Sequence, residues 1–274
     1  MTSTERNIFR IKLTLFGLTD LSRSEEFNRV LDEFDRDALF TPDSLSQDER
    51  KNKPYDRDWV VEEAAKRKRN FENWFYIKRR RVAKYEGAFV VGKEPYFYLE
   101  FNPKLNPKNY PKLFAFIDRV VDALRPDFAV LTIVPTYQYE PWPTNLDQEI
   151  DHFVDSSLSS IGDYRDNGPS GLGLYTWIGD HYIQQIGKEH LKKTPHVTIT
   201  AKDWGGVRIS LGPNNEPWTL DAQALVDNWR PAMEHLWQAG VFAEQYIYKE
   251  HNIKKTKAEN CVIGSRIADE DWER

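Results

Sequence analysis

The hydrophobic pattern of the first half of the chain predicts short strands and amphipathic helices. Residues 8–17, IFRIKLTLFG, alternate apolar and polar side chains, which is typical of a half-buried strand. From Ser24, behind a capping serine, apolar residues recur every three or four positions and predict a helix. The closely spaced segments NWFYIK, AFVV and PYFYLEFN are rich in β-branched and aromatic residues, as strands are. We therefore expect them to form an antiparallel meander.

Between these elements, residues 41–56 carry two prolines and little apolar mass, so we expect a loop. Asp58 is then expected to cap the helix WVVEEAAKRKR. Further along, NYPKLFAFIDRVVDAL has one apolar stripe and predicts a helix. The nearly all-apolar segment FAVLTIVP predicts a strand that is buried on both faces.

The second half predicts the same kinds of element in a different order. LDQEIDHFVDSSL predicts an amphipathic helix, LYTWI a strand, and residues 180–193 a further helix. HVTITAKDWGGVRISL predicts a hairpin that turns near its paired glycines, and residues 221–240 predict a last helix. Helices interleaved with hairpins indicate an α+β fold, with antiparallel sheets on which helices pack. We expect two closely packed α+β lobes, residues 1–136 and 137–274, with one continuous domain as the alternative.

Charge is unevenly distributed along this chain of net charge -5. Lys66 to Lys84 carries nine cations against one glutamate, a net of +8. Residues 66–81 place cations on both sides of an aromatic run, so the simplest prediction is a strand with buried rings and solvated charged ends. A site for an anionic partner and a nuclear import signal remain alternatives, and we expect only weak binding to single-stranded DNA.

The sequence shows no clear catalytic or metal-binding pattern. Its single cysteine, Cys261, cannot form an internal disulfide, and neither HExxH nor paired CxxC motifs occur. We therefore expect no enzymatic activity, no metal and no cofactor, although an active site assembled from distant residues remains a further alternative. The start MTSTERN lacks the features of a signal peptide, and no window resembles a membrane span. These features lead us to expect a cytoplasmic protein with no membrane partner.

An acidic stretch offers the strongest candidate for a binding surface. Residues 140–166 carry a net charge of -6, and three aspartates recur at four-residue spacing on one predicted helix face. Like charges at this spacing repel, so they form either a well-solvated face or a docking surface for a basic partner. The candidate partner-binding residues are Asp147, Glu149, Asp151, Asp155, Asp163 and Asp166.

Residues in the second half also carry a resemblance to a known family. The strand ending in Trp177, Ile178 and Gly179 is followed by the helix of DHYIQQIG, and the hairpin then carries DWGGV. Over residues 127–242 this layout is similar to immunity proteins of bacterial polymorphic toxin and type VI secretion systems, especially those that protect against restriction-endonuclease-fold toxins. No catalytic residue can be carried over, because such families have none.

The resemblance implies a cytoplasmic, non-catalytic inhibitor that binds a cognate toxin, often by covering its active site. Such a protein would act in competition between bacteria, with a protein rather than a nucleic acid as its partner. The +8 segment departs from the pattern of a simple acidic nuclease inhibitor. A nucleic-acid-associated protein that uses residues 66–81 therefore stays the alternative function.

Overall fold

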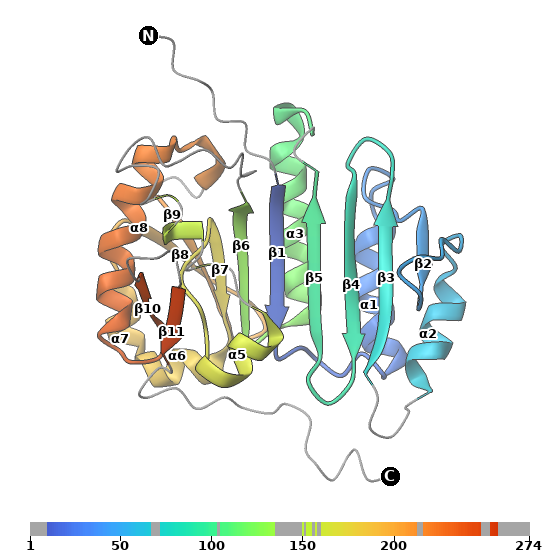
Figure 1. Cartoon of the computed structure of the whole chain (residues 1–274), viewed down its shortest axis with the longest axis horizontal. Helices are drawn as coiled ribbons and strands as arrows, with labels where there is room; N and C mark the ends of the chain where they lie inside the picture. The colour runs from blue at the N-terminus through green and yellow to red at the C-terminus, as the bar shows by residue number, and fades with distance from the viewer. Residues whose placement is uncertain are drawn as a thin grey trace.

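A single antiparallel sheet organises the chain (Figure 1). The computed structural model describes residues 10–66, 72–102, 105–134, 150, 152–154, 157, 160–212, 216–247 and 253–256. Within them, nine strands lie in the order β2-β3-β4-β5-β1-β6-β7-β9-β8, and every neighbouring pair is antiparallel. The strands are β1 (Arg10–Phe16), β2 (Ser44–Ser46), β3 (Asn73–Arg79), β4 (Tyr85–Val91), β5 (Tyr96–Phe101), β6 (Phe128–Val134), β7 (Tyr175–Ile178), β8 (Val197–Ala201) and β9 (Val207–Leu211).

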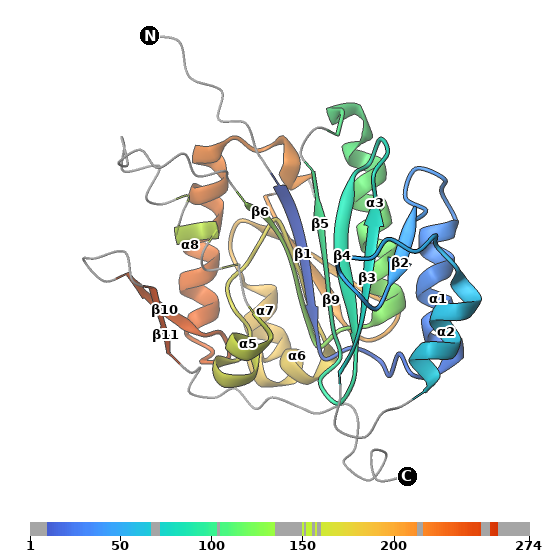
Figure 2. The same ribbon diagram turned by 45° about the vertical axis from the view of Figure 1, so that its right-hand side comes forward.

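Helices cover the two halves of this sheet from opposite sides. Figures 1 and 2 show α1 and α3 behind the half that contains β3, β4, β5 and β1, whereas α5 and α8 lie in front of the other half. The helices are α1 (Ser24–Asp35), α2 (Arg57–Ala65), α3 (Tyr110–Leu124), α5 (Ile161–Asn167), α6 (Asp180–Ile186), α7 (Lys188–Lys192) and α8 (Ala222–Trp237). A small separate sheet pairs β10 (Glu244–Ile247) with β11 (Ile253–Thr256), and two 3₁₀ turns, Pro107–Asn109 and Pro217–Thr219, complete the described elements.

Aromatic packing fixes the rear layer. Phe34 of α1 makes edge-on contacts with Phe89 and Phe97 of the sheet, with ring centroids 6.0 and 6.4 Å apart. Phe116 of α3 lies 5.1 Å from Phe34, so the two helices and the sheet share one aromatic cluster. All four rings are fully buried. Edge-to-face pairs of this kind stabilise a core beyond the area that they bury.

Charged residues join α3 to the β7–β9 part of the sheet. Asp118 of α3 accepts hydrogen bonds from Nε1 of Trp177 at 3.0 Å and from Nη1 of Arg208 at 2.7 Å. Lys202 lies 2.8 Å from Asp118 and 3.0 Å from Asp122. The side chains of Lys202 and Arg208 are each only 9% exposed, so the carboxylates compensate for two nearly buried cations.

The structure confirms the predicted α+β class and the β3–β4–β5 meander, and it corrects three details. The expected loop at 41–56 contains β2, because Leu45 lies in register with Ile77 and is buried. The cap of α2 is Asp56, whose carboxylate accepts the Trp59 N–H, and not Asp58, which is already inside the helix. α1 begins at Ser24 without a side-chain cap.

The predicted helix over 180–193 is two helices, α6 and α7. They are separated at Gly187, whose φ of 87° lies in a region that favours glycine and ends the first helix. Most of the expected helix LDQEIDHFVDSSL lies outside the described residues, although Ile150, residues 152–154 and Ser157 are helical. Strands from both expected lobes belong to one sheet, and the boundary at residue 136 stays a prediction.

No helix in the described part of the chain is both long enough and apolar enough to cross a membrane.

Candidate functional site: an open face of the sheet

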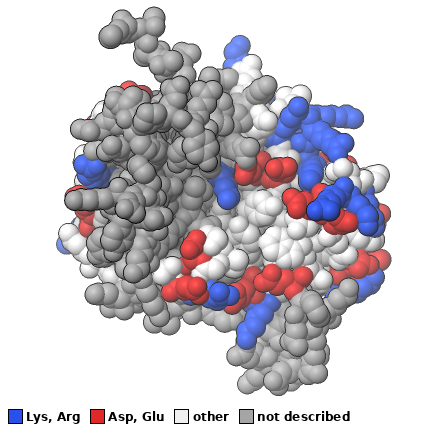
Figure 3. Space-filling model, in the orientation of Figure 1, with Lys and Arg blue, Asp and Glu red and all other residues white. Residues whose placement is uncertain are grey.

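The front of β3, β4, β5 and β1 is a sheet surface over which no described helix lies centrally, and we call it the open face (Figures 1 and 3). It forms because side chains alternate along each strand, so that one set packs on α1 and α3 while the other set points forward. The registers of the four strands define its twelve residues as Trp74, Tyr76, Lys78, Glu86, Ala88, Val90, Tyr96, Tyr98, Glu100, Lys12, Thr14 and Phe16.

One row across the open face is charged. Lys78 is in register with Glu86, Glu86 with Glu100, and Glu100 with Lys12. Directly opposed like charges destabilise a strand pair, whereas opposed unlike charges stabilise it. The two glutamates therefore oppose each other, with a lysine in register on each outer side. Nζ of Lys78 donates to the Glu49 carbonyl at 3.0 Å.

The next two rows are aromatic and apolar. Trp74 and Tyr76 of β3 lie with ring centroids 5.9 Å apart, and Tyr96 and Tyr98 of β5 also lie 5.9 Å apart. Trp74, Tyr76 and Tyr98 are only partly buried, so this part of the open face offers aromatic surface to solvent. Aromatic side chains that are rigid and half-exposed are common anchors of protein interfaces.

One end of the open face is closed by α5. Tyr164 of α5 stacks on Phe16 with ring centroids 4.4 Å apart, and Phe16 is fully buried. The Tyr164 hydroxyl in turn lies 2.8 Å from that of Tyr182. Thr14, Ala88, Val90 and Tyr96 are also buried. The accessible part of the open face therefore consists of Trp74, Tyr76, Tyr98 and the charged row.

The tyrosines lie in a negative electrostatic environment. Burial, followed by the charges of Glu49, Glu86 and Glu100, raises the pKa of Tyr98 to about 12. Burial also raises the pKa of Tyr76, with further contributions from Glu49 and Asp48. Each effect disfavours an added negative charge at the tyrosine, so the same carboxylates favour a cation placed against the open face.

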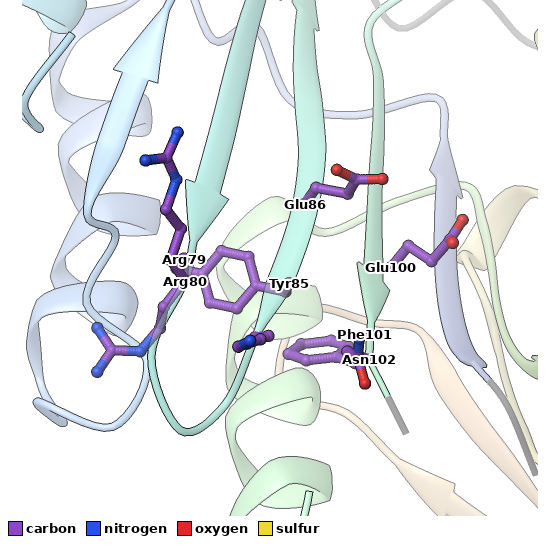
Figure 4. Close-up of a pocket in the computed structure, with 8 residues that line it drawn as sticks. Arg79, Arg80, Tyr85, Glu86, Glu100, Phe101 and Asn102 are labelled. Atoms are coloured by element: carbon purple, nitrogen blue, oxygen red, sulfur yellow. The ribbon is translucent and has the colours of Figure 1, made fainter. Parts of the chain in front are cut away.

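A shallow cavity of about 400 Å³ lies where the charged row meets the end of β3 (Figure 4). Figure 4 shows Glu86 and Glu100 side by side on neighbouring strands, with Arg79 and Arg80 at the neighbouring strand end. Arg79 is held in place, because its guanidinium donates to the carbonyls of Thr41 and Ala38. The cavity is lined by Arg79, Arg80, Lys84, Tyr85, Glu86, Glu100, Phe101 and Asn102.

For the basic segment, the prediction of a strand with charged ends is confirmed in residues 72–84, while residues 67–71 lie outside the described chain. Phe75 and Ile77 are fully buried as expected. Trp74 and Tyr76 are only partly buried on the open face, so the expectation that the rings are buried is wrong for these two. Alternate rings of this run face opposite sides of the sheet, so only Phe75 belongs to the core side while Trp74 and Tyr76 lie on the open face.

Of the six predicted acidic site residues, Asp147, Glu149, Asp151 and Asp155 lie outside the described residues. Asp163 completes a capping box at the start of α5, where its carboxylate lies 2.8 Å from the hydroxyl of Ser160.

Asp166 accepts a hydrogen bond from Nε of its neighbour Arg165 at 3.1 Å and is 64% exposed. Neither it nor Asp163 belongs to the open face, and their proposed role in partner binding stays a prediction.

Among the described residues, no cluster of three or more His, Cys, Asp or Glu side chains is arranged to hold a metal ion.

Comparisons with known proteins add little to this geometry. No protein-family model matches the chain, and no curated protein sequence matches it. The solved structure of a T6SS protein from Pseudomonas aeruginosa aligns with 82% of this chain and 74% of its own, at 13% sequence identity and a TM-score of 0.49. A likeness this distant carries no argument about function, so the site rests on its own residues.

Proposed function

We propose that this protein is a non-catalytic immunity protein, which binds and neutralises a cognate bacterial toxin in the cytoplasm. The observation that carries the proposal is the open face, where partly exposed Trp74, Tyr76 and Tyr98 lie beside the opposed Glu86 and Glu100. Aromatic anchors bordered by charge are the usual composition of a protein interface. The class of partner comes from the resemblance of residues 127–242 to toxin-immunity proteins.

The open face carries two lysines and two glutamates, and the carboxylates near its tyrosines would favour a basic group of a partner. Glu49 acts on both Tyr76 and Tyr98, Asp48 acts on Tyr76, and Glu86 and Glu100 act on Tyr98. A toxin that acts on nucleic acid needs cations around its active site to hold phosphate groups. An aromatic surface that presents carboxylates to these cations would be complementary to such a site and would block it.

The same charges argue against the nucleic-acid alternative. An antiparallel sheet with exposed aromatic rings is a known platform for stacking bases. Such a platform also needs cations to bind the phosphates, whereas the two lysines of this face share their row with Glu86 and Glu100. At the end of β3, the guanidinium of Arg79 donates to two backbone carbonyls, so this cation of the basic segment serves the fold.

The first test is to purify the tagged full-length chain from its native cells after nuclease treatment and to identify stoichiometric partners by mass spectrometry. A partner should then be purified and its affinity measured by calorimetry at physiological salt. We expect Tyr98→Ala with Glu86→Lys to weaken binding more than tenfold, because both remove central contacts of the interface. Glu25→Lys is the matched control, since Glu25 is exposed on α1 behind the sheet.

A second pair of substitutions shows whether the partner binds the open face or the acidic stretch of residues 140–166. Asp151→Lys with Asp155→Lys reverses the acidic stretch that the sequence predicts as a docking surface. If this pair of substitutions lowers the affinity for the partner and the open-face pair does not, the toxin binds the acidic stretch instead. If nucleic acid co-purifies when nuclease is omitted and no protein partner is found, the immunity proposal is wrong. Protection of cells that express the partner would establish neutralisation as well as binding.

A further inference from the structure

The nine-stranded sheet ends at β8, which pairs with β9 on one side and with no other described strand. Val197, Thr198, Ile199 and Thr200 are partly exposed, and Ala201 is exposed. Edge strands are usually protected from pairing by charged residues, prolines or bulges within the strand. The sequence VTITA has neither a charge nor a proline and is regular in its pairing with β9.

The hydrogen bonds at the two ends of the β8–β9 hairpin show which backbone groups face outward. The Gly212 N–H donates to the His196 carbonyl at 3.0 Å, and the Lys202 N–H donates to the Gly206 carbonyl at 2.9 Å. Bonded positions alternate along an antiparallel pair, so the even-numbered residues between them also bond to β9. The N–H and C=O groups of Val197, Ile199 and Ala201 therefore point away from the sheet.

The same three residues line a groove. A cavity of about 550 Å³ lies between the α6–α7 pair and the β8–β9 hairpin. Its apolar lining includes Ile183, Leu191, Val197, Ile199 and Val207. An added strand would find its hydrogen-bonding groups on the edge of β8 and a pocket for its alternate side chains beside it, and these are the two elements of strand addition.

The rim of the groove indicates the charge of the occupant. Lys188 and Lys192 line it from α7 and both are exposed, and the adjacent Lys193 is exposed as well. Two acids offset part of this charge, because Glu189 forms an ion pair with Lys192 at 2.8 Å and Asp180 also lines the groove. Lys202 lines it too, but Asp118 and Asp122 compensate its charge. Three lysines against two acids leave the rim with a small net positive charge. A second copy of this chain would bring two such lysine-bearing rims together, whereas an acidic segment would be attracted.

We propose that β8 is a strand-addition site for an extended segment of a protein partner, with alternating apolar side chains and at least one flanking acidic residue. The apolar side chains enter the groove beside Leu191 and Ile199, and the acidic residue meets Lys188 or Lys192. This site lies at the opposite end of the sheet order from β3 and β4 of the open face, and it does not depend on the proposed function.

The decisive variant is Ala201→Pro. Proline removes one outward N–H from β8 and leaves the bonds to β9 intact, because position 201 does not donate to β9. Ala201→Val is the matched control, since it keeps the N–H and suits a strand. Thermal unfolding of both variants checks that the fold is retained.

The probe is a phage-displayed library of random twelve-residue peptides, selected on the full chain and counter-selected on Ala201→Pro. We expect enriched peptides to alternate apolar residues, to carry an acidic residue, and to lose binding at least tenfold on Ala201→Pro but not on Ala201→Val. Lys188→Glu with Lys192→Glu should remove the preference for the acidic residue. In hydrogen exchange, a bound peptide should slow the amides of Val197, Ile199 and Ala201 more than those of Thr198 and Thr200.

Enrichment that is equal on wild type and Ala201→Pro would overturn the proposal, and so would a bound peptide that leaves the three outward amides unprotected. Light scattering measures the oligomeric state and so tests the other possible occupant of the groove, a second copy of this chain. A wild-type dimer that becomes a monomer in Ala201→Pro would show that β8 pairs with a second copy, and the proposal of an acidic partner segment would then be wrong.

Discussion

Glu86 of β4 and Glu100 of β5 lie directly opposite each other, in a row that continues to Lys78 on one side and Lys12 on the other. Opposed carboxylates cost stability that a fold could avoid by a single substitution. Their position at the border of a partly exposed aromatic surface suits a role outside the fold itself. A basic group from a partner would convert the repulsion between the two glutamates into two favourable contacts.

The repulsion can be measured with a double-mutant cycle of Glu86→Gln and Glu100→Gln. Each single substitution should change the free energy of unfolding only slightly, because it removes both a repulsion and an attraction to a neighbouring lysine. The coupling between the two should be unfavourable by about 0.2–1 kcal/mol. Urea unfolding at low and at high salt checks this, and the coupling should shrink as salt screens it. A favourable coupling energy would contradict the repulsion between Glu86 and Glu100.

Tyr98 makes the stability of the fold depend on pH in the alkaline range. Its pKa is raised to about 12, first by burial and then by neighbouring acids, from an ordinary value of 10.0. Below pH 10 the tyrosine is protonated in both the folded and unfolded states and contributes no pH dependence. Between pH 10 and 12 only the unfolded state releases the proton, so stability falls as pH rises.

Tyr98→Phe isolates this contribution from lysines and other tyrosines that titrate in the same range. We expect the variant to lose less stability than the wild type between pH 10 and pH 12, as measured by urea unfolding at each pH. Tyr110→Phe is a suitable control, because Tyr110 lies at the start of α3, away from the open face. Parallel pH profiles for wild type and Tyr98→Phe would argue against the raised pKa.

The α+β class and most strands could be predicted from the sequence because period-two and period-3.6 patterns survive wherever one face of an element is buried. The open face could not be found in the same way. In NWFYIKR both faces carry aromatic residues, and only the pairing of Phe75 with Phe89 and Tyr76 with Ala88 separates the core side from the exposed side. A search for alternate aromatic residues on adjacent strands, such as Tyr76 and Tyr98, would have been the available signal.

Other differences have local causes. Asp56 and Asp58 are both plausible caps by residue type, and the backbone of Asp56, extended at φ -132°, is what makes it the cap. The short strand β2 has too few residues for a periodic pattern, and it forms because β3 offers it an edge. The glutamate pair across β4 and β5 depends on a register that no local pattern contains.

Asp118 should be the most sensitive charged residue of the fold. Asp118→Asn leaves the nearly buried Arg208 without its carboxylate partner and weakens the compensation of Lys202. We expect a loss of about 2–4 kcal/mol in the free energy of unfolding. Asp122→Asn is the matched control on the same helix, since Asp122 is 40% exposed and its loss should cost less than about 1 kcal/mol. Equal losses for the two variants would show that burial does not set the cost.

Gly87 allows β4 and β5 to come close enough for the open face to form. A Cβ atom at this position would lie 2.2 Å from the Tyr98 carbonyl oxygen, which is backbone and cannot rotate away. Gly87→Ala should therefore displace β4 from β5 and destabilise the fold by about 2 kcal/mol or more. Denaturant unfolding measures the loss.

Gly162→Ala provides the opposite expectation within the same chain. Gly162 lies in α5, and the nearest atom to a Cβ there is the Ser160 hydroxyl oxygen at 3.7 Å, an ordinary contact. A helix favours alanine over glycine, so this variant should gain about 0.5–1 kcal/mol in the free energy of unfolding.

Gly87→Ala should also affect partner binding. Gly87 directly follows Glu86 and faces the strand that carries Glu100, so its substitution should separate the two carboxylates and weaken the binding of a partner to the open face. A Gly87→Ala variant with normal stability would mean that β4 and β5 are spaced differently from the register described above.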